Sequence, residues 1–231
     1  IAPPAAGWRF REWARDASGS NPTVTVVMNA PKNVVAIFDP ISTYRLETVA
    51  AGGGVIQGNV SSSYEEDTLV QLKAVPSEGW QFMQWEGDAS GSNPDITVTM
   101  DRAKSVEAVF GTSVSTTAVG GGRVELSLTT GPYAYGSKVL VTGVPDPGKC
   151  LTAWGGAASG MANPLVFTVT SANPTIYAAF ATVPAGKLLL TMIVEGGGMV
   201  TLTPPRNLFD SGESVTVTAV PDASWAFDHW S

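Results

Sequence analysis

The most regular hydrophobic pattern in the chain is a short segment in which apolar and polar positions alternate. One face of each copy carries two larger apolar residues on either side of an alanine: Val34, Ala36 and Phe38; Val106, Ala108 and Phe110; Ile176, Ala178 and Phe180. Alternation with a period of two predicts a half-buried strand. The small alanine predicts that another element approaches this face closely.

The longest uninterrupted stretch of the pattern, residues 40–110, predicts six strands. They are expected at Thr43–Ala50, Gly54–Val60, Thr68–Val75, Trp80–Trp85, Ile96–Met100 and Lys104–Phe110, with a polar loop at Ser61–Asp67. Glycine, proline or β-branched residues interrupt every candidate helix. The prediction is a mainly β unit with one core.

That unit recurs in tandem. Tryptophans stand at spacings of 72, 69 and 76 residues, at Trp13, Trp85, Trp154 and Trp230. A DASGSNP segment follows at 16–22 and 88–94, and AASGMANP at 157–164. The boundaries predicted from this register are the C-terminal half of a repeat at 1–39, complete repeats at 40–110 and 111–181, and the N-terminal half of a repeat at 182–231.

Aromatic residues are expected to hold each core together, because a small unit without disulfides needs large apolar side chains. The predicted core residues are Trp13, Trp85, Trp154, Trp230, Phe38, Phe110 and Phe180. A triple glycine at 52–54, 120–122 and 196–198 precedes each second strand, and we interpret it as a hairpin turn. No helix is predicted after it, so a phosphate-binding loop is not indicated.

Composition and charge narrow the function. The 231 residues include 25 glycines and 16 prolines but 13 Lys and Arg, and the formal net charge is −7. A surface of that sign repels phosphates, so neither nucleic acid nor anionic membrane is an expected partner. No apolar run reaches the ~18–20 residues that cross a bilayer, so membrane insertion is not expected, and the segment from Ile1 has no signal-peptide pattern.

The combined motif resembles the divergent internalin-type B repeat, a module of bacterial secreted and surface proteins. The best match runs over 66–110, with Leu72, Pro76, Trp80, Trp85 and Asn93-Pro94 in frame. The third copy departs from it at Lys149, Leu151 and Ala157. The resemblance implies an extracellular or cell-surface, non-catalytic module, built as a small β-sandwich or a β-grasp-like unit. Whether each repeat contains a helix stays open.

The sequence contains few residues that could carry out catalysis, and no catalytic residue is predicted. The single histidine, His229, and the single cysteine, Cys150, occupy positions that hold other residue types in the other copies. One cysteine allows no intrachain disulfide. The densest acidic stretch, Glu65 to Asp67, occurs in one copy only and is expected to be a solvated loop. The protein is therefore not expected to be an enzyme or to need a cofactor.

Calcium is one alternative that the sequence leaves open. The GDASGSNPD loop supplies oxygen donors of the kind that Ca²⁺ prefers, and the candidate ligands are Asp16, Asp88 and Asp95. The spacing differs from an EF-hand loop, however, and the third copy has Ala157 in place of the aspartate. Asp, Ser and Asn also suit an ordinary turn, in which their side chains bond to the backbone.

Glycan binding is a second alternative. Trp8, Trp80 and Trp225 lie five residues before the closing tryptophans, so a regular strand would direct them to the opposite face. An exposed ring there could stack on a sugar, or the neighbouring repeat could cover it.

The leading hypothesis is a structural tandem-repeat module that acts as a spacer, adhesion or assembly element of a larger protein. Its expected partners are other copies of the repeat, neighbouring domains, and a glycan or surface protein. The N-terminal half-copy supplies the late strands of a repeat and the C-terminal half-copy the early ones. Pairing of the two within or between molecules, including head-to-tail assembly into a filament, is therefore a further hypothesis.

Overall fold

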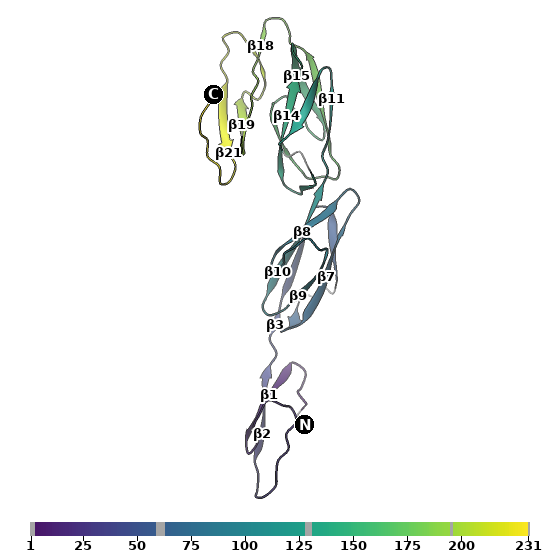
Figure 1. Ribbon diagram of the computed structural model, residues 1–231, viewed down its shortest axis with the longest axis vertical. Coiled ribbons are helices and arrows are strands. Elements are labelled where there is room, and N and C mark those ends of the chain that lie inside the picture. Colours follow the sequence, from purple (N-terminus) through teal and green to yellow (C-terminus); the bar gives the residue numbers. More distant parts are fainter. Residues whose placement is uncertain (1–2, 59–62, 128–130, 195, 231) are drawn as a thin grey trace.

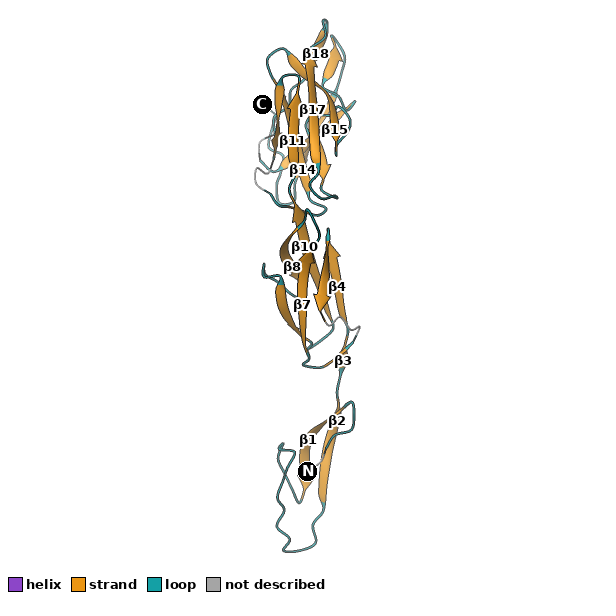
Figure 2. Cartoon of the chain, turned by 90° about the vertical axis from the view of Figure 1, so that its right-hand side faces the viewer, coloured by secondary structure: helices purple, strands orange, loops and turns teal. Residues whose placement is uncertain are grey.

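The computed structural model describes residues 3–58, 63–127, 131–194 and 196–230 (Figure 1). These residues form strands and loops without a helix, as Figure 2 shows. They contain no helix long and apolar enough to cross a membrane. The N-terminal half-copy and the two complete repeats follow one another along the long axis. The C-terminal half-copy lies beside the second complete repeat (Figure 1).

The first complete repeat is a sandwich of two three-stranded sheets. In one sheet β10 lies between β4, which is parallel to it, and β8, which is antiparallel. In the other, β7 lies between β5 and β9, and both pairings are antiparallel. The bounds are β4 Leu46–Ala51, β5 Gly54–Gly58, β7 Leu69–Pro76, β8 Gln81–Gly87, β9 Asp95–Thr99 and β10 Lys104–Thr112. The structure thus selects the sandwich form of the predicted all-β unit.

The predicted strands agree with these elements except at their ends. The segment expected at Thr43–Ala50 is divided at Arg45 into β3 (Thr43–Tyr44) and β4. The expected polar loop contains β6 (Tyr64–Glu65), which pairs with β3. The end of the strand expected to reach Val60 lies outside the described residues, because 59–62 are not among them.

The second complete repeat has the same topology. Its sheets have the orders β11-β17-β15 and β12-β14-β16, with β11 parallel to β17. The bounds are β11 Ser115–Val119, β12 Gly122–Leu126, β13 Tyr133–Ala134, β14 Lys138–Pro145, β15 Lys149–Gly156, β16 Leu165–Thr168 and β17 Thr175–Thr182.

Each terminal half-copy forms part of this sandwich. The N-terminal half contributes one antiparallel pair, the counterpart of β8 and β10; the C-terminal half contributes the counterparts of β5 with β7 and of β3 with β6. The bounds are β1 Trp8–Arg15, β2 Val34–Pro40, β18 Lys187–Leu189, β19 Gly198–Thr203, β20 Leu208–Asp210 and β21 Thr216–Pro221.

The core of each complete repeat lies between its sheets. Trp85 is 2% exposed, and Val106, Ala108 and Phe110 are fully buried. The cross-strand partner of each closing tryptophan is the small alanine of the alternating segment: Trp13 with Ala36, Trp85 with Ala108, and Trp154 with Ala178. In these three copies the tryptophan lies beside the alanine on the neighbouring strand of the same sheet.

Burial differs in the half-copies. Trp154 and Phe180 are buried like their counterparts in the first complete repeat, whereas Trp13 and Phe38 are half-buried. Trp230, which was expected in a core, is 56% exposed. The reason is that the described C-terminal half contains no counterpart of β10 to pack against it.

The triple glycines are not hairpin turns, which corrects the interpretation from sequence. β4 and β5 belong to different sheets, so Gly52 and Gly53 carry the chain from one sheet of the sandwich to the other. A Cβ on Gly53 would lie 2.2 Å from the Trp80 ring, and one on Gly54 would lie 2.3 Å from Phe110. Glycine is required because the Trp80 and Phe110 rings leave no room for a side chain at these two positions.

Candidate functional site

In the first three copies the closing tryptophan fixes the loop that follows it, which is Asp-Ala-Ser-Gly in the first two copies and Ala-Ala-Ser-Gly in the third. Its backbone N–H donates to the carbonyl oxygen of the loop glycine, and its indole Nε1–H donates to a carbonyl eight residues downstream. The indole bonds are Trp13 to Asn21 (2.9 Å), Trp85 to Asn93 (2.9 Å) and Trp154 to Ala162 (2.7 Å). The same residue therefore fills the core and closes the loop.

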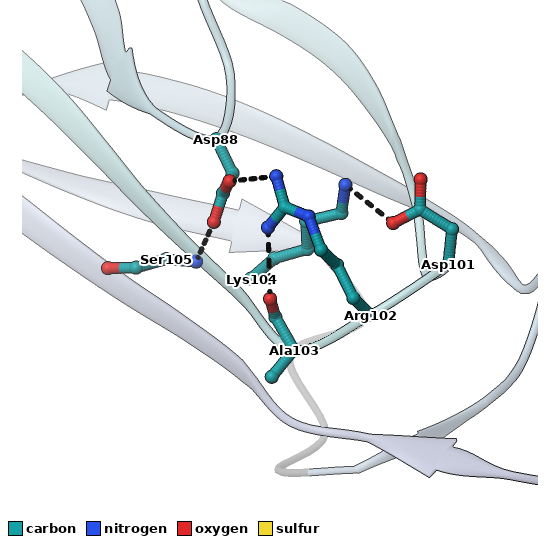
Figure 3. A network of polar contacts seen from close by, with 6 residues as sticks. All are labelled: Asp88, Asp101, Arg102, Ala103, Lys104 and Ser105. Carbon is teal, nitrogen blue, oxygen red and sulfur yellow. Dashed lines mark hydrogen bonds and ion pairs between the residues drawn. The ribbon is translucent and has the colours of Figure 1, made fainter.

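The loop aspartate binds the turn that begins the last strand. Asp88 Oδ2 accepts from the Ser105 N–H at 2.7 Å, and its Oδ1 accepts from Arg102 at 2.6 Å (Figure 3). The Arg102 guanidinium, and then the Ser105 amide, hold the pKa of Asp88 below its usual value. Beside it, Lys104 Nζ lies 2.7 Å from Asp101 and lowers the pKa of that carboxyl. Both oxygens of Asp88 thus have a partner within the chain.

The other copies indicate what this aspartate does. Asp16 Oδ2 accepts from the Asn33 N–H at 2.6 Å, the bond that Asp88 makes with Ser105. In the third copy Ala157 replaces the aspartate, and Ala172 and Pro174 take the positions of Arg102 and Lys104. The main-chain bond between Ala157 N–H and Thr175 O remains, at 2.9 Å. The carboxylate and its cations are lost together, as expected for a local ion pair.

For the calcium hypothesis, the structure shows only where the candidate ligands lie. Asp95 lies on β9 with its carboxylate 3.6 Å from Lys73, so the candidate ligands Asp88 and Asp95 each have a cationic partner. A shallow hollow of about 270 Å³ has Asp88, Asp101 and Lys104 in its lining, but not Asp95. The described residues contain no group of three His, Cys, Asp or Glu side chains placed to hold a metal ion. Calcium at Asp16, Asp88 and Asp95 stays a prediction.

The two complete repeats share a continuous strand. β10 extends past its own sandwich, and Gly111 and Thr112 pair with Ala134 and Tyr133 of β13 in the next repeat. Thr112 is fully buried there. Its hydroxyl donates to Gly79 O at 2.7 Å in the first repeat and accepts from Asn173 N–H at 2.8 Å in the second. The joint therefore consists of a shared strand and a buried polar bridge.

The junctions of the half-copies are built differently. At the N-terminal junction the Ile41 N–H donates to Gly7 O, and Arg9 pairs with Glu66 at 3.1 Å. At the C-terminal junction Asn207 Nδ2 donates to Asn163 O at 2.8 Å. At neither junction does one strand enter both units, because β2 ends at Pro40 before β3 begins at Thr43, and β17 ends at Thr182 before β18 begins at Lys187.

A crevice opens beside the shared strand. It measures about 390 Å³ and is lined by both repeats: Ala50, Gly52, Gly53, Trp80, Tyr135, Thr170, Ser171 and Ala172. The Trp80 and Tyr135 rings lie 6.1 Å apart between centroids and are inclined by 54°. Trp80 is half-buried, because its ring covers Gly53 and lies beside Tyr135 of the next repeat.

The other two tryptophans proposed for glycan binding are more open. Trp8 is 47% exposed and Trp225 is 60% exposed. Trp225 covers Gly197 as Trp80 covers Gly53, and in the third copy Lys149 takes this place over Gly121. Trp80, Trp225 and Lys149 are thus equivalent covers of a glycine crossing. Among the three tryptophans proposed for glycan binding, Trp80 lines the crevice between the complete repeats and Trp8 and Trp225 do not.

Cys150 and His229, the two residues considered for catalysis, lie in different environments. Cys150 is fully buried with its Sγ 3.6 Å from Ala181 O. His229 is exposed and has Asp228 as its neighbour at 2.8 Å. Sequence reasoning missed Thr112, Gly79 and Asn173, which form the joint. The asparagine is replaced by Ala103 in the first complete repeat, and the threonine recurs at Thr182, where it is exposed.

Helix-free sandwiches repeated along the chain and joined through a shared strand define a tandem β-repeat array. The family model of the divergent InlB B-repeat domain matches the chain four times, at residues 1–42, 44–113, 112–184 and 188–231. The chain therefore belongs to the divergent InlB B-repeat family. Neither the comparison with curated proteins nor that with solved structures returned a match. The family is associated with bacterial surface and extracellular proteins, and its modules are typically non-catalytic.

Proposed function

We propose that the array acts as a stiff spacer in a bacterial surface or secreted protein. The observation that carries this proposal is the joint between the complete repeats. β10 passes from one sandwich into the next without a linker, and the buried Thr112 hydroxyl bonds to both. A flexible connection would need unpaired residues between the domains. The shared strand supports a fixed angle between the two repeats and hence an arm that keeps its reach.

The proposal predicts a single distance between labels placed on either side of the joint. Cysteines at the exposed positions Gln71 and Glu125 would carry the spin labels, and the native Cys150 is fully buried. Electron double resonance is expected to give one narrow distribution. Thr112→Val leaves Gly79 O and Asn173 N–H unpaired, at a cost of about 1–3 kcal/mol, and should broaden it.

Thr182→Val is the matched control, because Thr182 has the equivalent position but is exposed. This variant should keep the narrow distribution of the parent. A broad distance distribution in the parent protein would overturn the spacer proposal. Equal distance distributions in the two valine variants would show that the Thr112 hydroxyl does not hold the angle between the repeats.

A glycan-binding role is the second candidate. It is favoured by the crevice beside Trp80, where two aromatic rings stand next to the hydroxyls of Thr170 and Ser171. Rings with polar groups beside them suit the apolar face and the hydroxyls of a sugar.

On a glycan array, binding by the parent should fall at least tenfold in Trp80→Ala. Trp225→Ala removes an equivalent tryptophan outside this crevice and should leave binding at Trp80 unchanged. Absence of any retained glycan would eliminate this role, and an equal loss in both variants would place the sugar elsewhere.

A further inference from the structure

The first and last strands of each complete sandwich lie side by side and run in the same direction. In the first complete repeat β4 is parallel to β10 over six residue pairs, beginning with Leu46 opposite Lys104. In the second, β11 is parallel to β17 over five residue pairs. Because each pair is parallel, the chain enters the sandwich at one end of this ladder of hydrogen bonds and leaves it at the other.

Tension between the two ends of a repeat therefore acts along the ladder. The paired strands follow the long axis of the molecule (Figure 2). A pull on the start of β4 and on the end of β10 slides one strand past the other, so all the hydrogen bonds between them share the force. A pull that separates the strands from one end breaks the same bonds one after another. Since forced unfolding depends on the rate of crossing the unfolding barrier, the lengthwise pull needs the larger force.

The last strand is held more firmly than the first. β10 lies between β4 and β8, and its residues Val106, Ala108 and Phe110 are fully buried. In the described part of the chain β4 pairs with β10 alone, and Leu46 is the one buried residue among the six of this strand. β4 is therefore the strand that detaches first, and the hydrogen bonds of its ladder set the force more than the core does.

We propose that the array bears tension, and that the parallel ladder of each complete repeat is the element that resists it. Two residues, Ser113 and Val114, separate the end of β10 from the start of β11, so a pull passes directly from the first ladder to the second. The inference rests on the proposed spacer function, since an arm that links the parts of a surface protein transmits the forces between them.

The register shows which amides of β4 take part in the ladder. The Lys104 N–H donates to Arg45 O at 2.9 Å. In a parallel ladder, alternate residues direct both their N–H and their C=O to the neighbouring strand. The N–H of Val49 therefore faces β10, and the N–H of Ala50 faces away from it. Both residues are exposed, so they offer a matched pair of substitutions.

Single-molecule force spectroscopy on the full chain tests the direction of the pull. Handles attached at Arg45→Cys and Ser113→Cys pull the ladder lengthwise, whereas handles at Arg45→Cys and Ala103→Cys separate its strands from one end. The three positions are exposed, and the native Cys150 is fully buried. At one pulling speed the lengthwise geometry should need at least twofold more force. Equal forces in the two geometries would overturn the inference.

Proline substitution tests the ladder itself. Val49→Pro removes an N–H that faces β10, and Ala50→Pro removes one on the open side of the strand, where proline is tolerated. In the lengthwise geometry Val49→Pro should lower the unfolding force, whereas Ala50→Pro should match the parent. Equal forces in the two proline variants would show that this ladder does not resist the pull, which contradicts the inference.

These outcomes are distinct from a failure of the spacer proposal. The distance between labels at Gln71 and Glu125 is measured without force, so a weak ladder would leave a fixed angle at the Thr112 joint in place. A broad distance distribution together with a high lengthwise force would instead remove the stiff spacer and leave each repeat strong under tension.

Discussion

Replacement of Trp85 by alanine is expected to unfold the first complete repeat while the second keeps its fold. Trp85 is 2% exposed and packs with Phe82 and the last strand of its sheet. Truncating a buried tryptophan costs about 3–5 kcal/mol. The whole stability of a domain of this size is about 5–15 kcal/mol, near the lower end for so small a core. Hydrogen exchange followed by mass spectrometry would show which repeat loses protection.

Two variants separate the roles of this tryptophan. Trp85→Phe keeps an aromatic ring but removes the indole donor to Asn93 O, so it should loosen the loop more than the core. Trp13→Ala removes the equivalent residue from the half-copy, where it is half-buried, and should cost less. Unchanged exchange in Trp85→Ala would contradict the core assignment for this repeat.

The alternating segments were the part of the fold that the sequence determined best. Period-two alternation requires one buried face, and Val106, Ala108 and Phe110 occupy it. The residue opposite the alanine on the neighbouring strand is Trp85.

The triple glycines show where the sequence was ambiguous. A hairpin and a crossing between sheets both need glycine at positive φ, so the residues alone do not identify the partner strands. The informative signal lay downstream, at Trp80 and Trp225, which cover Gly53 and Gly197. A contact between residues this distant in sequence depends on the sandwich, and single-strand periodicity contains no information about it.

The joint was harder to predict for another reason. Thr112 follows the alternating segment, and its counterparts are Pro40 and Thr182. A position that varies between copies looks like a free surface position. Its burial arises only when two sandwiches meet, because the bonds from its hydroxyl extend to Gly79 on one side and Asn173 on the other.

The second large effect is expected from Gly120→Ala, which tests the crossing between the sheets of the second complete repeat. Gly120 has φ of +89°, and a Cβ there would lie 1.8 Å from the Phe180 carbonyl oxygen. The clash involves the backbone of β17, whose Phe180 side chain is buried, so the strand must move out of the core. Such displacement costs about 1–3 kcal/mol, in addition to about 1–2 kcal/mol for a left-handed alanine.

Gly186→Ala isolates the second of these terms. Gly186 has φ of +80°, but a Cβ there has open space around it. Urea unfolding should show a small loss for Gly186→Ala and a clearly larger one, confined to the second complete repeat, for Gly120→Ala. Equal losses would mean that β17 moves freely at Phe180. A rigid β17 is required by the shared architecture, since β11 and β15 both pair with this one strand.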